Sequence, residues 1–308
     1  MTRVSARELR AHAEIHARAG LIASEYSLIG LGAAALLVTL LLLLLPDYAD
    51  MQLLRPGLAA SAGLLGCGAA VSVVGRWLDL GGSRRQVRLA RLWWPLLSGA
   101  LIGALGSLLA LHRAGLIRET ADHVLWPTAL LGLFAALALV ALFLLAALGL
   151  RALAAVDSGA PMPLTQLWQS TTHCLLGGLG LVALIGFSAD TLPRALQVYL
   201  ATAISVMCGH AALAAARLLH GSRRTLRGLR AAGLHVALVE RGHALASGAL
   251  LIGIVVPGLL VLWHLLVNRE LPLMPACGVI AVSNHAMRYA LVLLPLNAPL
   301  SQIPQQSV

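Results

Sequence analysis

The chain has 308 residues, of which 59% are hydrophobic and only 11% charged, and its mean hydropathy is +0.86. A net charge of +10 would suggest a nucleic-acid partner in a soluble protein, but membrane proteins carry such an excess in their cytoplasmic loops. We therefore expect an all-α polytopic membrane protein with membrane lipid, and no nucleic acid, around it.

Eight apolar blocks without Asp, Glu, Lys or Arg follow one another along the chain, and about 20 such residues cross the hydrocarbon as a helix. The blocks are Ser27–Leu45, Gly57–Gly75, Leu92–Leu111, Val124–Leu150, Cys174–Ala189, Ala195–Ala216, Gly242–Asn268 and Leu271–Met287. They predict eight transmembrane helices, arranged as two packed four-helix bundles, in one membrane domain over residues 27–308. Residues 1–26, in which arginine and glutamate are interleaved, predict a short amphipathic helix on the cytoplasmic surface.

The distribution of arginine predicts the orientation of these helices. All 22 basic residues are arginine. Sixteen fall on the side that holds the N-terminus, the even-numbered loops and the C-terminus, five fall on the other side, and Arg288 lies inside the last span. By the positive-inside rule, both termini are expected to be cytoplasmic, with the chain in the bacterial inner (plasma) membrane.

Two basic segments, Gly75–Pro95 and Ala216–His243, contain arginines spaced along one helix face. These arginines are Arg84, Arg88 and Arg91, with Arg85 beside them, in the first segment and Arg223, Arg227 and Arg230 in the second. One interpretation is topology determination with contact to anionic lipid. The other is a docking surface for an acidic partner subunit, and the two are compatible.

The last predicted span, ACGVIAVSNHAMRYALVLLP, contains Asn284, His285 and Arg288, which are expected to share one helix face. An arginine at this depth costs about 2.5–3.5 kcal/mol, so we expect it to face the bundle interior and to bind a polar ligand. The alternative is that Arg288 reaches the cytoplasmic headgroups. Asp79, which closes the second block, is either an ion-pair partner of the nearby arginines or part of the same ligand site.

Metal, haem and proton-coupled chemistry have little support in the sequence. The four cysteines are isolated, without CxxC or Cys/His ligand spacing, so no metal site is expected. His210 and His285 are the histidine pair of similar depth, which leaves haem b as an alternative. The acids near the blocks, Asp79, Asp190 and Glu240, lie at block ends, which argues against a proton-driven carrier.

The segment LDLG followed by GSRRQVRLARLWWPLLSG resembles the dimethyl sulfoxide reductase-type membrane anchor subunits, with Arg85 at the position of the family arginine. AAVDSGAPMPLTQLW is similar to the family connection between spans 4 and 5. SNHAMRYALVL is similar to the family ending, with Arg288 on its arginine and Asn284 on its glutamate. Two departures are Asp79, which replaces the family histidine implicated in quinol binding, and the absence of the span 3 glutamate.

The resemblance implies an anchor subunit that binds no cofactor and is not itself catalytic. Quinone or quinol would bind at Asp79, Asn284, His285 and Arg288. Electrons would pass between the quinone pool and an iron–sulfur subunit that serves a molybdopterin catalytic subunit, with both partners on the cytoplasmic side. The alternatives are a small-molecule transporter (permease), for which Pro257 is the candidate helix break, and a haem b subunit.

Overall fold

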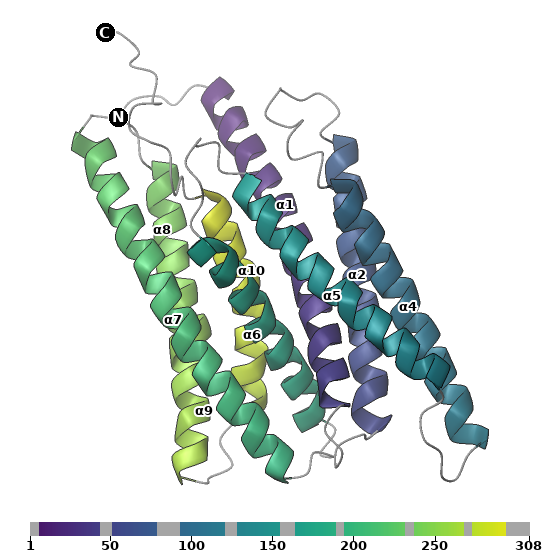
Figure 1. The fold of residues 1–308 in the computed structure, drawn as a ribbon. Coiled ribbons are helices and arrows are strands. Elements are labelled where there is room, and N and C mark those ends of the chain that lie inside the picture. The colour runs from purple at the N-terminus through teal and green to yellow at the C-terminus, as the bar shows by residue number, and fades with distance from the viewer. Residues whose placement is uncertain are drawn as a thin grey trace.

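The computed structural model describes residues 6–43, 51–78, 93–120, 128–154, 164–188, 194–231, 237–267 and 273–293, and these residues are helical almost throughout. The helices are α1 (Ala6–Leu42), α2 (Met51–Leu78), α4 (Trp93–Thr120), α5 (Thr128–Ala154), α6 (Leu164–Ser188), α7 (Arg194–Ala231), α8 (Ala237–Leu250), α9 (Val256–Val267) and α10 (Leu273–Leu293). A π-helical turn, η1 (Leu251–Val255), joins α8 to α9 in one rod (Figure 1).

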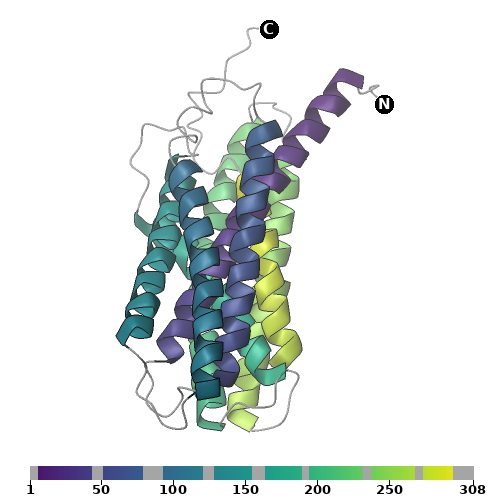
Figure 2. The same cartoon turned by 90° about the vertical axis from the view of Figure 1, so that its right-hand side faces the viewer.

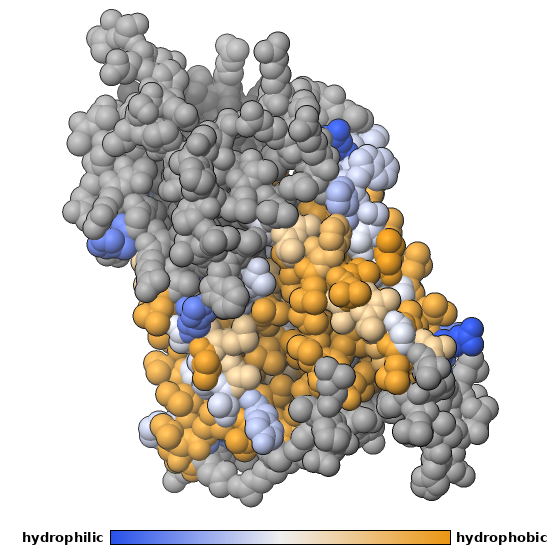
Figure 3. Space-filling view, in the orientation of Figure 1, coloured by the Kyte–Doolittle hydropathy of each residue, from blue (hydrophilic) through white to orange (hydrophobic). Residues whose placement is uncertain are grey.

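Six helical segments of the described chain are long and apolar enough to cross a membrane. They are Gly20–Leu42, Leu54–Trp77, Trp93–Ala114, Ala129–Gly149, Leu196–Leu213 and Ala244–Val267, and α6 adds the shorter apolar stretch Thr171–Gly186. Apolar side chains cover the middle of the face seen in Figure 3. The protein is therefore multi-pass and all-helical over its described residues, and the full set of eight spans stays a prediction.

The helices pack in two groups of four. In the first group α1, α2, α4 and α5 form a closed ring, and in the second α6, α7, the α8–η1–α9 rod and α10 form another. Each group has its own core of buried apolar side chains. Helix α1 packs against α6 and α10 as well as α2 and α5, so it is the central helix of the whole bundle.

Small residues allow α1 to approach α6 closely at the joint between the two groups. A Cβ on Gly178 of α6 would come within 2.6 Å of backbone atoms of Ala34 and Ala35 on α1. Since no real side chain tolerates such a distance, the two helix backbones can touch here only because residue 178 is glycine.

Two long helices continue past positions at which the sequence predicts a boundary between two segments. Helix α1 continues across residue 26, the expected boundary between a surface helix and the first span. Helix α7 continues to Ala231, so much of the second basic segment extends a membrane-spanning helix.

The α8–α9 rod is interrupted at Pro257, which has no N–H for the carbonyl of Gly253 four residues earlier. The preceding turn is π-helical, with the N–H of Val256 bonded to the carbonyl of Leu251. The Ser283 hydroxyl of α10 lies 3.0 Å from the Gly253 carbonyl and 2.8 Å from the carbonyl of Ile280 in its own helix, so its one hydrogen serves both acceptors. A side chain from a neighbouring helix thus replaces the donor that proline removes.

Candidate functional site

Polar side chains gather around α1 near the end of the bundle where this helix begins. One contact joins α1 to α10, where Nδ1 of His285 lies 3.2 Å from the hydroxyl oxygen of Ser27. Ser27 is buried and His285 is exposed at the bundle surface. The imidazole is therefore held through one nitrogen, while its ring reaches the lipid-facing side of the bundle.

A second contact joins α1 to α2. The Ser72 hydroxyl donates to Oε1 of Glu25 at 2.7 Å. Both residues are buried, with Glu25 only 5% exposed. An ionisable group at this position is expensive in a membrane and marks a functional site by default.

The groups beyond Ser72 lead towards the end of α2. The indole Nε1–H of Trp93, the first residue of α4, donates to the Ser72 carbonyl at 3.2 Å. One turn after Ser72, the guanidinium of Arg76 lies 5.8 Å from the centre of the Trp93 ring. Arg76 is exposed, so Glu25 is linked through Ser72 to groups at the bundle surface.

A half-buried strip of α1 separates the two contacts. Leu21, Ser24, Leu28 and Leu31 recur every three or four residues and are half-buried, whereas the residues between them are mostly buried. Helices α2 and α10 each pack along α1 but share no extended packing with each other over the described residues. Figure 2 shows the first turns of α1 projecting from the bundle at the upper right, beside the N-terminus.

The helical period places the two polar contacts on opposite edges of this strip. At 100° per residue, Glu25 lies on the α2 side of Ser24 and Leu28, and Ser27 lies on the α10 side. The result is a half-buried strip of three leucines and Ser24, with a carboxyl group at one edge and an imidazole at the other.

Asn284 lies deeper than the sequence predicts. It is 4% exposed, and its Nδ2 lies close to Gly177 of α6, 3.3 Å from where a Cβ would stand. Neither its Oδ1 nor its Nδ2 has a hydrogen-bond partner within the described residues. The side chain therefore sits between α10 and α6, behind His285, and not at the open strip.

Several expected site residues lie outside the described part of the chain. Asp79 and the first group of arginines, Arg84, Arg85, Arg88 and Arg91, are among them. Arg288 lies in α10 and Arg223, Arg227 and Arg230 lie in α7, but the positions of their side chains are not described. Of the four expected quinone ligands, Asn284 and His285 can thus be placed.

The expected haem pair is not brought together. His285 contacts α1, and His210 is exposed on α7, a helix that shares no extended packing with α10 over the described residues. Among those residues, no three His, Cys, Asp or Glu side chains gather as metal ligands would. A bis-histidine haem needs two imidazoles that face each other, which this arrangement does not supply.

Glu25 was not predicted from the sequence. A block defined by the absence of charge begins at Ser27 and so leaves Glu25 out. The candidate membrane-spanning segment of α1, Gly20–Leu42, contains Glu25 as its sixth residue. The spacing of apolar residues on both sides of Glu25 was the available signal.

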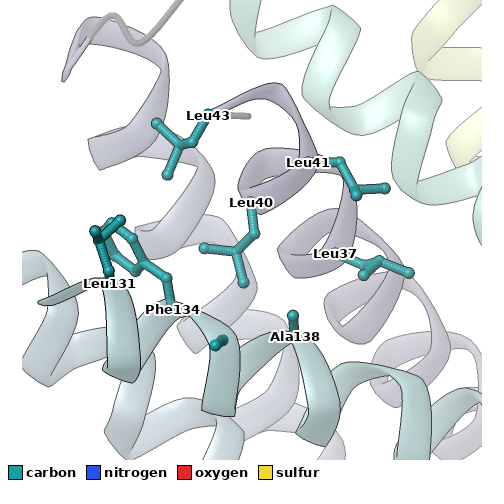
Figure 4. Close-up of a pocket in the computed structure, with 8 residues that line it drawn as sticks. Leu37, Leu40, Leu41, Leu43, Leu131, Phe134 and Ala138 are labelled. Carbon is teal, nitrogen blue, oxygen red and sulfur yellow. The ribbon is translucent and has the colours of Figure 1, made fainter. Parts of the chain in front are cut away.

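A hydrophobic cavity of about 270 Å³ lies at the other end of α1 (Figure 4). It is lined by four leucines near the end of α1 and by Leu131, Phe134, Ala135 and Ala138 of α5. Leu37 is ten residues beyond Ser27, roughly 15 Å along the helix axis. The cavity is therefore separate from the polar contacts and contributes no reactive group to them.

Comparison with known proteins adds no further assignment. No protein-family model, no curated protein and no solved structure matches this chain.

Proposed function

We propose that the protein is the membrane anchor and quinone-reactive subunit of a molybdopterin/iron–sulfur oxidoreductase in the bacterial inner membrane. The observation that carries the proposal is His285, held by Ser27 at the edge of the half-buried α1 strip. A quinone diffuses within the bilayer, so its ring can reach the imidazole sideways while its isoprenoid tail lies along the leucines of α1.

The hydrogen bond to Ser27 suits this role chemically. A neutral imidazole whose Nδ1–H donates to the Ser27 oxygen presents the lone pair of Nε2 to a quinol hydroxyl. Asn284 would support His285 from behind, and Arg288 and Asp79 complete the proposed quinone site.

The wider complex follows from the resemblance in the sequence. An iron–sulfur subunit would take electrons from the quinol, or return them, and pass them to or from a molybdopterin subunit. In this proposal both termini are cytoplasmic, eight helices span the membrane, and the basic segments that contain Arg85 and Arg227 dock the partners. Co-purification of the two subunits with the tagged chain, identified by mass spectrometry, tests this part.

Quinone binding is tested on the full chain in mild detergent. Decylubiquinol is titrated under reducing conditions while tryptophan fluorescence is followed, and His285→Ala is expected to raise the Kd by about tenfold, the loss of roughly one hydrogen bond. Val282→Ala, a change at an exposed neighbour on the same helix, is the matched control and should leave the Kd unchanged. Equal affinity in the wild type and His285→Ala would contradict the proposal.

A proton-coupled carrier is the second candidate, and the buried carboxyl of Glu25 is the observation that favours it. The interruption of the α8–α9 rod before Pro257 is also typical of transporters. The two functions differ in the surroundings of the α1 strip, which is aqueous in a carrier and lipidic in a quinone subunit. Leu28→Cys, in a chain whose exposed Cys67 is replaced by serine, should resist a membrane-impermeant maleimide if the strip faces lipid.

A further inference from the structure

Glu25 has a place in the bundle that the quinone site at His285 does not by itself explain. The carboxyl is buried between α1 and α2, and it accepts a hydrogen bond from Ser72. Apolar residues precede and follow it in a segment that crosses the membrane. A hydrophobic residue would pack there without the cost of burying an ionisable group.

Glu25 lies at the edge of the α1 strip and near the end of α2. Glu25 is next to Ser24 on the α1 strip, and on its other side Ser72 leads to Trp93 and Arg76. Helix α2 ends at Leu78, six residues after Ser72, which is roughly 9 Å along the axis. A proton held at Glu25 therefore has polar groups between it and the end of α2.

We propose that Glu25 is a proton acceptor for quinol bound on the α1 strip. This inference rests on the proposed function. Oxidation breaks both O–H bonds of the quinol: one proton goes to the Glu25 carboxylate and the other to Nε2 of His285. The two electrons leave one at a time to an iron–sulfur cluster of the partner subunit, and the quinone remains.

Three helices that pack against α1 carry charged or titratable side chains among the described residues: Arg76 lies on α2, His173, which is buried, lies on α6, and His285 lies on α10. Helix α5 presents no charged side chain over residues 129–149. Each of the three can be replaced without touching Glu25, so their influence on its protonation can be separated from the loss of the carboxyl itself.

The test is infrared difference spectroscopy on the purified full chain with decylubiquinol, oxidised by ferricyanide in place of the iron–sulfur partner. The wild type is expected to show a new carbonyl band of a protonated carboxyl group on quinol oxidation. Glu25→Gln should abolish the band, while Glu25→Asp should restore it at a shifted frequency. Glu240→Gln, at the half-buried acid of α8, is the matched control and should retain the band.

The outcomes separate this inference from the proposed function. If quinone binds to the wild type and the carboxyl band persists in Glu25→Gln, the assignment of Glu25 is overturned and the quinone site stands. If the wild type binds no quinone, both are overturned. Should Glu25→Gln fail to fold, Ser72→Ala provides the test: loss of its hydrogen bond must shift the band, and an unshifted band overturns the inference.

Discussion

The two four-helix groups differ in the regularity of their helices and in the acceptors of their buried hydroxyl groups. In the first group the helices are uninterrupted over their described residues, and polar hydroxyls such as Ser61 and Ser107 bond to carbonyls of their own helix. In the second group one rod is interrupted, and Ser283 bonds across helices to repair it. The first group thus contains the buried acid of the proposed site, and the second contains the irregular backbone.

This difference shows where polar side chains are needed for structure and where they are not. Ser283 is explained by the carbonyl that Pro257 leaves without a donor. Glu25 accepts a hydrogen bond from the side chain of Ser72 on α2. The contact of Glu25 thus joins two side chains, whereas Ser283 serves a backbone carbonyl.

The largest expected effect is at the joint between the groups. Gly178→Ala places a Cβ within 2.6 Å of the α1 backbone, so the two groups must move apart. We expect a loss of about 3 kcal/mol in the free energy of unfolding, the upper part of the usual range for overpacking. Reversible unfolding in mixed detergent and SDS, followed by circular dichroism, measures it. Gly63→Ala, at a glycine with open space around it, is the control and should cost nothing.

The repair of the interrupted rod is tested by a double-mutant cycle. Ser283→Ala should destabilise the protein by about 1–2 kcal/mol, because it leaves the Gly253 carbonyl without its donor. Pro257→Ala restores a backbone N–H at that position. In the Pro257→Ala background the cost of Ser283→Ala should therefore fall towards zero, and an equal cost in both backgrounds would refute the repair.

A substitution of Asn284 tests whether the contact between α10 and α6 serves stability or ligand binding. Its amide is buried with no hydrogen-bond partner within the described residues. Asn284→Leu keeps the shape and removes the polar group, so we expect the free energy of unfolding to rise by about 1 kcal/mol. The same variant should bind decylubiquinone less tightly if Asn284 supports His285. A less stable variant would show that the amide contributes to packing.

The smallest effect is expected within the first group. Ser107→Ala removes a hydroxyl that bonds only to the Gly103 carbonyl of its own helix, 2.7 Å away. Since that carbonyl also has a helical partner, the change should cost less than about 0.5 kcal/mol. A cost equal to that of Ser283→Ala would remove the distinction between the two groups.

The sequence predicted the helical class and most of the membrane-crossing segments, because a long run of apolar residues has few other structures in lipid. It predicted a break near Pro257, but not the π-helical turn or its repair, which depends on a serine 26 residues away in α10. The pattern of small residues in α2 could not distinguish Gly63 from Gly68. A Cβ added to Gly63 would face open space, whereas a Cβ added to Gly68 would meet the side chain of Ile29. Contacts between helices decide these outcomes.

The candidate site could be predicted in part. The sequence predicted Asn284 and His285 on one helix face, but the structure separates them: Asn284 is buried against α6, and His285 is exposed and contacts α1. Their different depths, and the role of Ser27 as partner of His285, depend on which helix lies next to α10. The sequence did not predict Glu25 as a site residue, because blocks defined by the absence of charge cannot contain a buried acid.

The central position of α1 has a consequence for how the protein is made. Ser72, which donates a hydrogen bond to Glu25, follows it by only 47 residues. His285 comes 258 residues after Ser27. At about 5–20 residues per second, that delay is on the order of tens of seconds. The bond between Ser72 and Glu25 can therefore form in a short hairpin of α1 and α2, whereas the imidazole edge of the strip is assembled only after α10 has been synthesised.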